Sequence, residues 1–273
     1  MNFIYLNPDQ MRADFLGCHG HPVSQTPNID RLATQGTRFD QCHVQHTVCT
    51  PSRCSFMTGW YPHVSGHRTL WHTLRPHEPN LLKYLKRAGY DVQWWGKNDL
   101  LAPESFASSV TAAGHPGGAD MGANPWNLSD PEYYSFLYDP VETPVEEHGD
   151  YRAVQGAIDY LDAGPESPFC IYVPIGFPHC PYRAHQPWHD RYDPADLPPL
   201  RPAEVSGKAD YHEAIRAGRR LDELDEWVFR KIQAVYLGMV SYVDWLLGRL
   251  LDTLDASGHA EDTTVLFFSD HGD

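Results

Sequence analysis

Cys49 and Arg53 stand four residues apart in the stretch HTVCTPSRCSFMTG (residues 46–59). Residues 51–59 are predicted to form a short helix, with a proline at its start and Gly59 just past its end. A helix N-terminus favours anions and lowers the pKa of a nearby thiol. The stretch therefore predicts one of two things: a structural cysteine in a turn, or a nucleophile beside a cationic anion clamp.

Four apolar segments are predicted strands, and polar residues follow each of them directly. The segments are 3–6, 91–95, 169–176 and 263–268, and the residues after them are Asp9 and Gln10, Lys97, His179, and Asp270 and His271. Parallel strands place their carboxyl ends on one edge of a sheet, where open α/β sheets bind ligands. We therefore expect these side chains to converge although they are far apart in the sequence.

The first and last of these groups could hold a divalent metal ion. Asp9, Gln10, Asp270 and His271 offer two carboxylates, an amide carbonyl and an imidazole. Oxygen-rich sets with one nitrogen are typical of divalent metal sites. The alternative is ordinary turn chemistry, because Asp is common directly after a strand.

Arg53, Lys97 and His179 could place positive charge on the same edge. Such groups would suit an anionic substrate. The alternatives are a solvated loop lysine and a hydrogen-bonded core histidine. The spacing of these residues does not decide between them.

The segments between the strands read as helices. Helices are predicted over 26–36, 51–59, 79–89, from 149 onward and over about 226–256. In the fourth, an apolar stripe is formed by Val154, Ala157, Ile158 and Leu161. Strands that alternate with amphipathic helices predict an α/β fold with a largely parallel sheet. Residues 103–148 and 181–226 are rich in polar residues and proline and are expected to be irregular excursions.

Composition excludes several classes of protein. The 273 residues are 41 % hydrophobic, enough for a core in one domain over 1–273, and the net charge of −15 argues against nucleic acid or an anionic membrane as a partner. No continuous apolar run reaches the roughly 18 residues of a membrane span. The opening residues NFIYLN do not resemble a signal peptide, so a cytoplasmic location is expected. The six cysteines form no CxxC pair and are expected to be mostly reduced and buried.

Several stretches together resemble the sulfatase family. CTPSRCSFMTG is similar to the family's C-x-P-x-R motif, whose cysteine is converted to formylglycine. The stretch that begins DQMRADFLG resembles the family's first metal-binding segment, and FFSDHGD resembles its second metal pair. GYDVQWWGK resembles the segment that carries the catalytic lysine, and GFPHCPY resembles the segment that carries the substrate-side histidine. The resemblance covers nearly the whole chain in the family's order. It implies an alkaline-phosphatase-like fold with helices on both faces of the sheet.

The resemblance also implies roles for the residues. Cys49, as formylglycine hydrate, would attack sulfur through one hydroxyl, and the other hydroxyl would later expel sulfate and regenerate the aldehyde. Arg53 would hold that residue and stabilise developing charge, Lys97 would bind a sulfate oxygen, and His179 would help the leaving group depart. The metal would be held by Asp9, Gln10, Asp270, His271 and the oxygen at position 49. Calcium is the expected ion, with manganese and magnesium as alternatives.

The implied partners are a small anionic ester and a formylglycine-generating enzyme, and assembly into a homo-oligomer stays open. Gln10 and His271 stand where many family members have Asp and Asn, and both resemble the phosphonate monoester hydrolase branch as well as many bacterial sulfatases. Asp99 stands where the family usually has a histidine, so His72 and Asp99 are candidate substrate-binding residues. Because the chain ends inside the last metal motif, we expect the family's second lysine and smaller C-terminal domain to lie beyond it.

Three functions remain open from the sequence. The resemblance favours an arylsulfatase-like sulfuric ester hydrolase. A phosphonate or phosphate ester hydrolase could use the same formylglycine and metal. The third alternative is a non-catalytic fragment that binds an anion or a metal. The four tryptophans Trp60, Trp71, Trp94 and Trp95 could line a pocket for an aryl group or a sugar, or could simply pack in the core.

Overall fold

One parallel sheet organises the chain. The computed structural model describes residues 1–114, 122–166, 168–203 and 207–273. Five strands in these ranges pair in the order β3-β2-β4-β1-β5, and every neighbouring pair is parallel. They are β1 (Asn2–Asn7), β2 (Asp91–Trp95), β3 (Ala112–Gly114), β4 (Phe169–Pro174) and β5 (Thr263–Phe267). The predicted α/β fold with a largely parallel sheet is confirmed.

The central strand β4 is apolar throughout because both of its faces are covered. All six of its residues are buried. Ile171 and Val173 belong to one hydrophobic cluster, whereas Cys170 and Tyr172 belong to a second cluster on the opposite face. This alternation follows from the period of two along a strand. The register that pairs Ile4 with Ile171 continues both clusters into β1.

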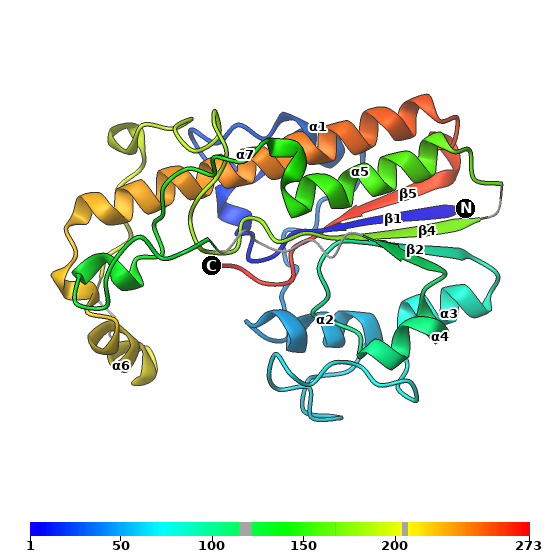
Figure 1. Ribbon diagram of the computed structural model, residues 1–273, viewed down its shortest axis with the longest axis horizontal. Helices are drawn as coiled ribbons and strands as arrows, with labels where there is room; N and C mark the ends of the chain where they lie inside the picture. Colours follow the sequence, from blue (N-terminus) through cyan, green and yellow to red (C-terminus); the bar gives the residue numbers. More distant parts are fainter. Residues whose placement is uncertain (115–121, 167, 204–206) are drawn as a thin grey trace.

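Helices cover both faces of the sheet, as predicted. They are α1 (Pro27–Gln35), α2 (Cys49–Thr58), α3 (Leu81–Arg87), α4 (Phe106–Ser109), α5 (Gly149–Asp162), α6 (Tyr211–Gly218) and α7 (Glu226–Ala256). In Figure 1, α1, α5 and α7 lie over one face and α2, α3 and α4 over the other. The side that carries α2 also carries the candidate nucleophile.

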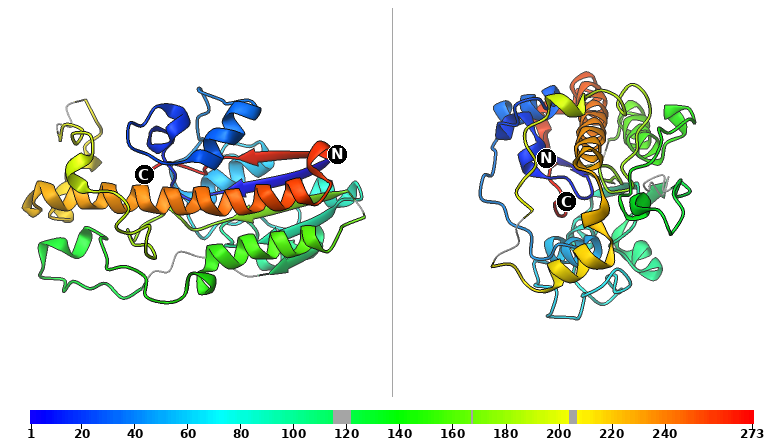
Figure 2. Two further views of the ribbon diagram at one scale, coloured as in Figure 1. Left: turned by 90° about the horizontal axis from the view of Figure 1, so that it is seen from above. Right: turned by 90° about the vertical axis from the view of Figure 1, so that its left-hand side faces the viewer.

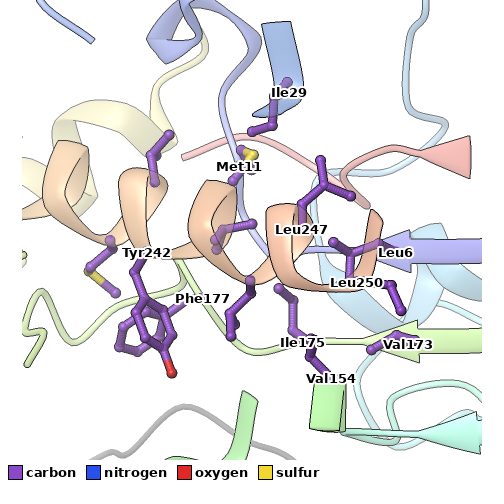
Figure 3. Packing of buried hydrophobic residues seen from close by; sticks show 14 of the residues in the cluster. Leu6, Met11, Ile29, Val154, Val173, Ile175, Phe177, Tyr242, Leu247 and Leu250 are labelled. Carbon is purple, nitrogen blue, oxygen red and sulfur yellow. The ribbon is translucent and has the colours of Figure 1, made fainter. Parts of the chain in front are cut away.

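The 31-residue helix α7 forms the centre of the larger cluster. It runs along the sheet beside α5 and continues past the carboxyl ends of the strands (Figure 2). Leu247 and Leu250 pack over Leu6 of β1 (Figure 3). By length and composition this helix could cross a membrane, but 89 % of its most apolar window is buried inside the protein. Its apolar character is therefore accounted for by core packing.

The helix α2 begins two residues earlier than predicted. The amide of Ser52 donates to the carbonyl of Val48, so the first helical residue is Cys49 and not Pro51. Proline fits there because the first amides of a helix have no partner within it. Gly59 ends the helix with φ 74°, as predicted. The cysteine therefore lies within the first turn, where the helix dipole is positive.

The two segments expected to be irregular contain short elements. Within 103–148 lie α4 and β3, and β3 pairs with β2 through Gln93 and Ala112. Within 181–226 lies α6. The prediction of irregular chain is wrong for these parts, because elements of three to eight residues are too short to show a clear period. Residues 115–121 and 204–206 of these segments lie outside the described residues.

Candidate active site

The polar residues that follow the strands meet at one edge of the sheet, as predicted. β1, β4 and β5 all end on the side of the sheet where the C-terminus lies (Figure 1). Lys97, after β2, is 2.5 Å from a carboxylate oxygen of Asp9, after β1. Arg53 of α2 is 2.9 Å from Asp270, after β5. Residues from both ends of the chain therefore share one site.

Arg53 is the central cation of this site. Its side chain is fully buried, and each nitrogen of the guanidinium has a partner. Nε donates to Asp270 at 2.9 Å, Nη2 to Asp9 at 3.1 Å and Nη1 to Asn7 at 2.7 Å. These bonds fix the positions of the two carboxylates. The role of Arg53 in holding residue 49 and stabilising developing charge stays a prediction.

Cys49 lies against the carboxylate and imidazole groups. Its Sγ is 3.4 Å from Oδ1 of Asp9 and 3.3 Å from Nε2 of His271. Nδ1 of His271 is 2.8 Å from the carbonyl oxygen of Gly272, and a carbonyl only accepts, so Nδ1 carries a proton. Burial lowers the pKa of this ring, but hydrogen bonds to Asp9 and Cys49 raise it to about 10, so Nε2, which faces both residues, also carries a proton. The thiol, both carboxylates and the imidazole form one contiguous group.

The two carboxylates differ in their affinity for a proton. Burial raises the pKa of Asp9, but a hydrogen bond from His271 and the charges of Arg53 and Lys97 outweigh it and hold the pKa well below its usual range. Burial also raises the pKa of Asp270, and there Arg53 does not fully compensate. Asp9 is therefore the carboxylate that stays ionised and pairs with the cations of the site.

Gln10 adopts a backbone conformation that is unusual for its residue type. Its φ is 62°, in the left-handed region. Its amide donates to Oδ1 of Asp270 at 3.1 Å, and its carbonyl accepts from the hydroxyl of Tyr236 at 2.6 Å. These two bonds fix the strained residue. The side-chain nitrogen donates to Asp273, so its amide group lies at the outer rim of the site.

Lys97 is placed by a close approach of two strands. Gly96 has φ 134°, and a Cβ there would lie 2.0 Å from the carbonyl oxygen of Pro174. Only glycine fits, and the amide of Lys97 donates to that same carbonyl at 3.0 Å. The ammonium then reaches Asp9, and it also pairs with Asp99 at 2.7 Å. Asp99 therefore contacts the predicted lysine directly.

His179 is held on the same edge by a buried carboxylate. Asp150 accepts from the amides of Gly176 at 2.7 Å and Phe177 at 2.8 Å, which fixes the loop after β4. Burial lowers the pKa of His179, but hydrogen bonds to the side chains of Cys180 and Cys49 raise it to about 11. The imidazole is therefore protonated at neutral pH and can donate a proton.

His72 lies apart from the other predicted residues. Its side chain is exposed, and its ring is 3.5 Å from the hydroxyl of Thr69. Among the described residues, no hydrogen bond joins its ring to the catalytic cluster.

Two of the tryptophans are accounted for by the core or its margin: Trp94 is buried and Trp95 packs on Gly156, whereas Trp71 is 86 % exposed.

Three supporting residues were not predicted. Asn7 accepts from Arg53 and from the hydroxyl of Tyr172, which lies 3.0 Å away. Asp150 orients the loop that carries His179. Asn7 stands at the end of an apolar strand, two residues before Asp9, and this position could have indicated it. Nothing local distinguishes Tyr172 or Asp150, whose partners lie far away in the sequence.

The cluster suits a divalent cation. Asp9, Cys49, Asp270 and His271 are all buried, and one ligand atom from each lies within 4.8 Å of the others. Buried carboxylates need a compensating charge, and two carboxylates with one imidazole are a common donor set for divalent ions. Nε2 of His271 faces the cluster and would become a ligand atom by giving up its proton, while Nδ1 is held by the Gly272 carbonyl. The donors present therefore fit such an ion.

Several known proteins are similar in sequence to this chain over its whole length. The family model described as Sulfatase matches residues 1–273. The chain is 31 % identical over 281 residues to an ulvan-active sulfatase of Formosa agariphila, and the matched region covers 100 % of this chain and 50 % of that protein. It is 29 % identical over 327 residues to a multifunctional alkaline phosphatase superfamily protein of Trinickia caryophylli, covering 100 % of this chain and 63 % of the relative. The chain thus spans about half to two thirds of the length of these relatives.

The fold is also shared with a solved structure. The phosphonate monoester hydrolase of Agrobacterium radiobacter superposes with a TM-score of 0.78 at 21 % identity, over 100 % of this chain and 62 % of that one. At that identity the likeness shows the fold alone. Because the family model spans every residue and the buried cluster holds the cysteine of the family motif, the chain belongs to the sulfatase family.

Proposed function

We propose that the protein hydrolyses sulfuric esters, in the manner of an arylsulfatase, with a formylglycine nucleophile formed from Cys49. The observation that carries the proposal is the position of Cys49 in the first turn of α2, with Sγ 3.4 Å from Asp9 and 3.3 Å from His271. A structural cysteine in a turn needs none of these partners. Maturation requires a formylglycine-generating enzyme as a partner.

A bound divalent ion and formylglycine at position 49 would supply a defined chemistry. A divalent ion with formylglycine hydrate supplies an activated oxygen nucleophile and stabilises negative charge on the transferred group. Asp9, Asp270 and His271, with Gln10 at the rim, would hold the ion. Arg53 keeps both carboxylates oriented. Since the site is buried and its donors are preorganised, little reorganisation is needed when charge develops.

Lys97 and His179 would act on the substrate. The side chain of Lys97 is 16 % exposed, and its ammonium lies beside Asp9, where it can donate to an oxygen of the sulfuryl group. His179 is protonated and can give its proton to the ester oxygen as the alcohol leaves. Asp99 holds Lys97 from the other side, which is a positioning role.

A second function draws support from the same residues. Gln10 and His271 replace a more acidic pair, and Asp99 replaces a histidine beside Lys97. Gln10 and His271 resemble the phosphonate monoester hydrolase branch as well as many bacterial sulfatases, so hydrolysis of phosphonate or phosphate esters is the alternative. A protein that only binds a metal or an anion is the third candidate, and it would carry unmodified Cys49.

One comparison separates the three. The purified protein, co-expressed with a formylglycine-generating enzyme, is assayed on 4-nitrophenyl sulfate and on 4-nitrophenyl phenylphosphonate, with the peptide around Cys49 analysed by mass spectrometry. A larger kcat/KM on the sulfate, together with formylglycine at position 49, supports the proposal. A larger kcat/KM on the phosphonate supports the alternative. Formylglycine without turnover of either ester would contradict both.

A further inference from the structure

Asp99 places a second carboxylate beside Lys97, on the outer side of the candidate active site. Its Oδ2 lies 2.7 Å from the ammonium, whose other ion-pair partner within the described residues is Asp9 at 2.5 Å. The two carboxylates differ in exposure, because the side chain of Asp9 is fully buried whereas that of Asp99 is 28 % exposed. Lys97 therefore has a buried anion on one side and an anion that faces solvent on the other.

Asp9 links this pair to the nucleophile position. Its Oδ2 contacts the ammonium of Lys97, and its Oδ1 is 3.4 Å from Sγ of Cys49. The ionisable groups that act on Lys97 include Asp9, Arg53, Asp99 and Cys49. Burial and Arg53 lower the pKa of this lysine, but the two carboxylates outweigh them and raise it. Burial also lowers the pKa of Arg53, and Asp99 is among the carboxylates whose charges raise it. The charge of Asp99 therefore acts on two cations of the site.

The loop that carries Asp99 has a fixed backbone. Oδ1 of Asn98 accepts from the amides of Leu100 at 3.1 Å and Leu101 at 2.9 Å, and its Nδ2 donates to the carbonyl of Leu101 at 2.8 Å. The amide of Leu74 donates to the carbonyl of Leu100 at 2.8 Å, which ties the loop to the chain before α3. Asp99 lies between these anchored residues. Its backbone position is therefore fixed before a substrate binds.

A substrate oxygen that binds Lys97 must lie close to Asp99. An ammonium has three N–H donors, and Asp9 and Asp99 occupy two directions around it. An oxygen in the third direction, at a hydrogen-bond distance of about 2.8 Å from Nζ, is about 4–5 Å from the Asp99 oxygen, because the donors point to the corners of a tetrahedron. At that separation two negative charges repel each other even beside water.

The size of this repulsion depends on the charge that the substrate brings. A sulfate ester and a phosphonate monoester each carry one negative charge at neutral pH, whereas a phosphate monoester carries nearly two, because its second pKa is about 6. Repulsion by one fixed carboxylate is twice as large for a dianion as for a monoanion at the same place. This difference belongs to Asp99 whatever the sum of the other charges, because a change to Asn removes one charge and leaves the others in place.

We propose that Asp99 sets the charge selectivity of this site: it favours esters whose transferred group carries one negative charge and disfavours the dianions of phosphate monoesters. The inference rests on the proposed ester hydrolysis at Cys49, and it applies to sulfate and phosphonate esters alike. Among the phosphorus esters of the alternative function, it favours phosphonate monoesters and phosphate diesters, which are monoanions. Asp99 is then a specificity-determining residue as well as the neighbour that positions Lys97.

Two ligands of the same shape and different charge test the proposal without turnover. Benzenesulfonate carries one negative charge, and phenylphosphonate carries two at about pH 8.5, well above the second pKa of a phosphoryl group. Calorimetry measures both dissociation constants for proteins co-expressed with a formylglycine-generating enzyme. Asp99→Asn should improve the binding of phenylphosphonate relative to benzenesulfonate about tenfold. Asp99→Glu keeps the charge and should keep the wild-type ratio. Glu104→Gln is the matched control, because Glu104 is an exposed carboxylate on the turn η3 (Pro103–Ser105), and it should also keep the ratio.

Kinetics on 4-nitrophenyl sulfate and 4-nitrophenyl phosphate separates this inference from the proposed function. Asp99→Asn should raise kcat/KM on the phosphate relative to the sulfate, again about tenfold. If neither ester is hydrolysed but the binding ratio changes as expected, the charge role of Asp99 stands and the proposed hydrolysis fails. If the esters are hydrolysed but Asp99→Asn weakens both charges equally or leaves the ratios unchanged, the charge role is overturned and the hydrolysis stands. Failure of both ligands to bind, or loss of the ratio in Asp99→Glu as well, would also overturn the charge role.

Discussion

Nε of Arg53 donates to Oδ2 of Asp270 at 2.9 Å, although the two residues are 217 positions apart. The same guanidinium reaches Asp9 at 3.1 Å. One side chain of α2 thus joins the loop after the first strand to the loop after the last. Cys49, the proposed nucleophile, lies one helical turn earlier and contacts the same Asp9.

Loss of Arg53 should destabilise the fold. Arg53→Gln leaves Asp9 and Asp270 buried without their shared cation, and breaking a buried ion pair costs about 3–5 kcal/mol. Urea unfolding of the wild-type and variant proteins measures the change. Arg87→Gln, at an exposed site, should change the free energy of unfolding by no more than about 0.5 kcal/mol. A similar small effect for Arg53→Gln would show that the guanidinium does not hold the carboxylates together.

Much of this arrangement could be predicted from the sequence. Strong strand and helix patterns placed Asp9, Lys97 and Asp270 at the carboxyl ends of parallel strands, and the structure brings them together. Tyr172 could not be predicted as a partner of Arg53, because it carries no local pattern that relates it to α2. Short elements such as β3 were missed because three residues show no periodicity.

Removal of Lys97 should reduce catalysis more than stability. Lys97→Ala takes away a charge-assisted donor of about 1.5–3 kcal/mol, so kcat/KM should fall more than tenfold. Lys97→Arg should not restore it, because a planar fork poorly replaces a compact ammonium between Asp9 and Asp99. Steady-state kinetics on the preferred ester measures both. A near-normal Lys97→Ala would place Lys97 outside the chemistry.

Divalent ions should stabilise the protein through the buried cluster. A cation that binds only the folded state raises the melting temperature by an amount that grows with the logarithm of its concentration relative to its Kd. After treatment with a chelator, calcium, manganese and magnesium are added singly and the melting temperature is recorded. We expect at least one ion to raise it and Asp270→Asn to abolish the shift. An equal shift in Asp270→Asn would mean that the ion binds elsewhere.

Asp244 should make stability depend on pH in the mildly acidic range. From α7 its carboxylate accepts from the amides of Asn28 at 2.9 Å and Ile29 at 2.8 Å, and so caps α1. Burial raises its pKa to about 6, above the value of 3.8 for an unperturbed Asp. The folded state therefore binds more protons than the unfolded state between these values, and this group adds stability as the pH falls from about 6 toward 4.

Urea unfolding of wild-type and Asp244→Asn proteins across that range isolates the contribution of this carboxylate. The difference between the two free energies of unfolding should change with pH, moving in favour of the wild-type protein as the pH falls. A difference that stays constant would show that the Asp244 carboxylate titrates alike in the folded and unfolded states.

The pair Cys49→Ala and Cys54→Ala tests the central claim most directly. Both cysteines are buried on α2, but Cys49 contacts Asp9 and His271, whereas the nearest hydrogen-bond acceptors of Cys54 are the carbonyls of His72 and Leu100 at 3.9 and 4.0 Å. Hydrolysis of 4-nitrophenyl sulfate is measured for each variant beside the wild-type protein, all co-expressed with a formylglycine-generating enzyme. We expect Cys49→Ala to abolish turnover and Cys54→Ala to retain most of it. Turnover that survives in Cys49→Ala would contradict the account.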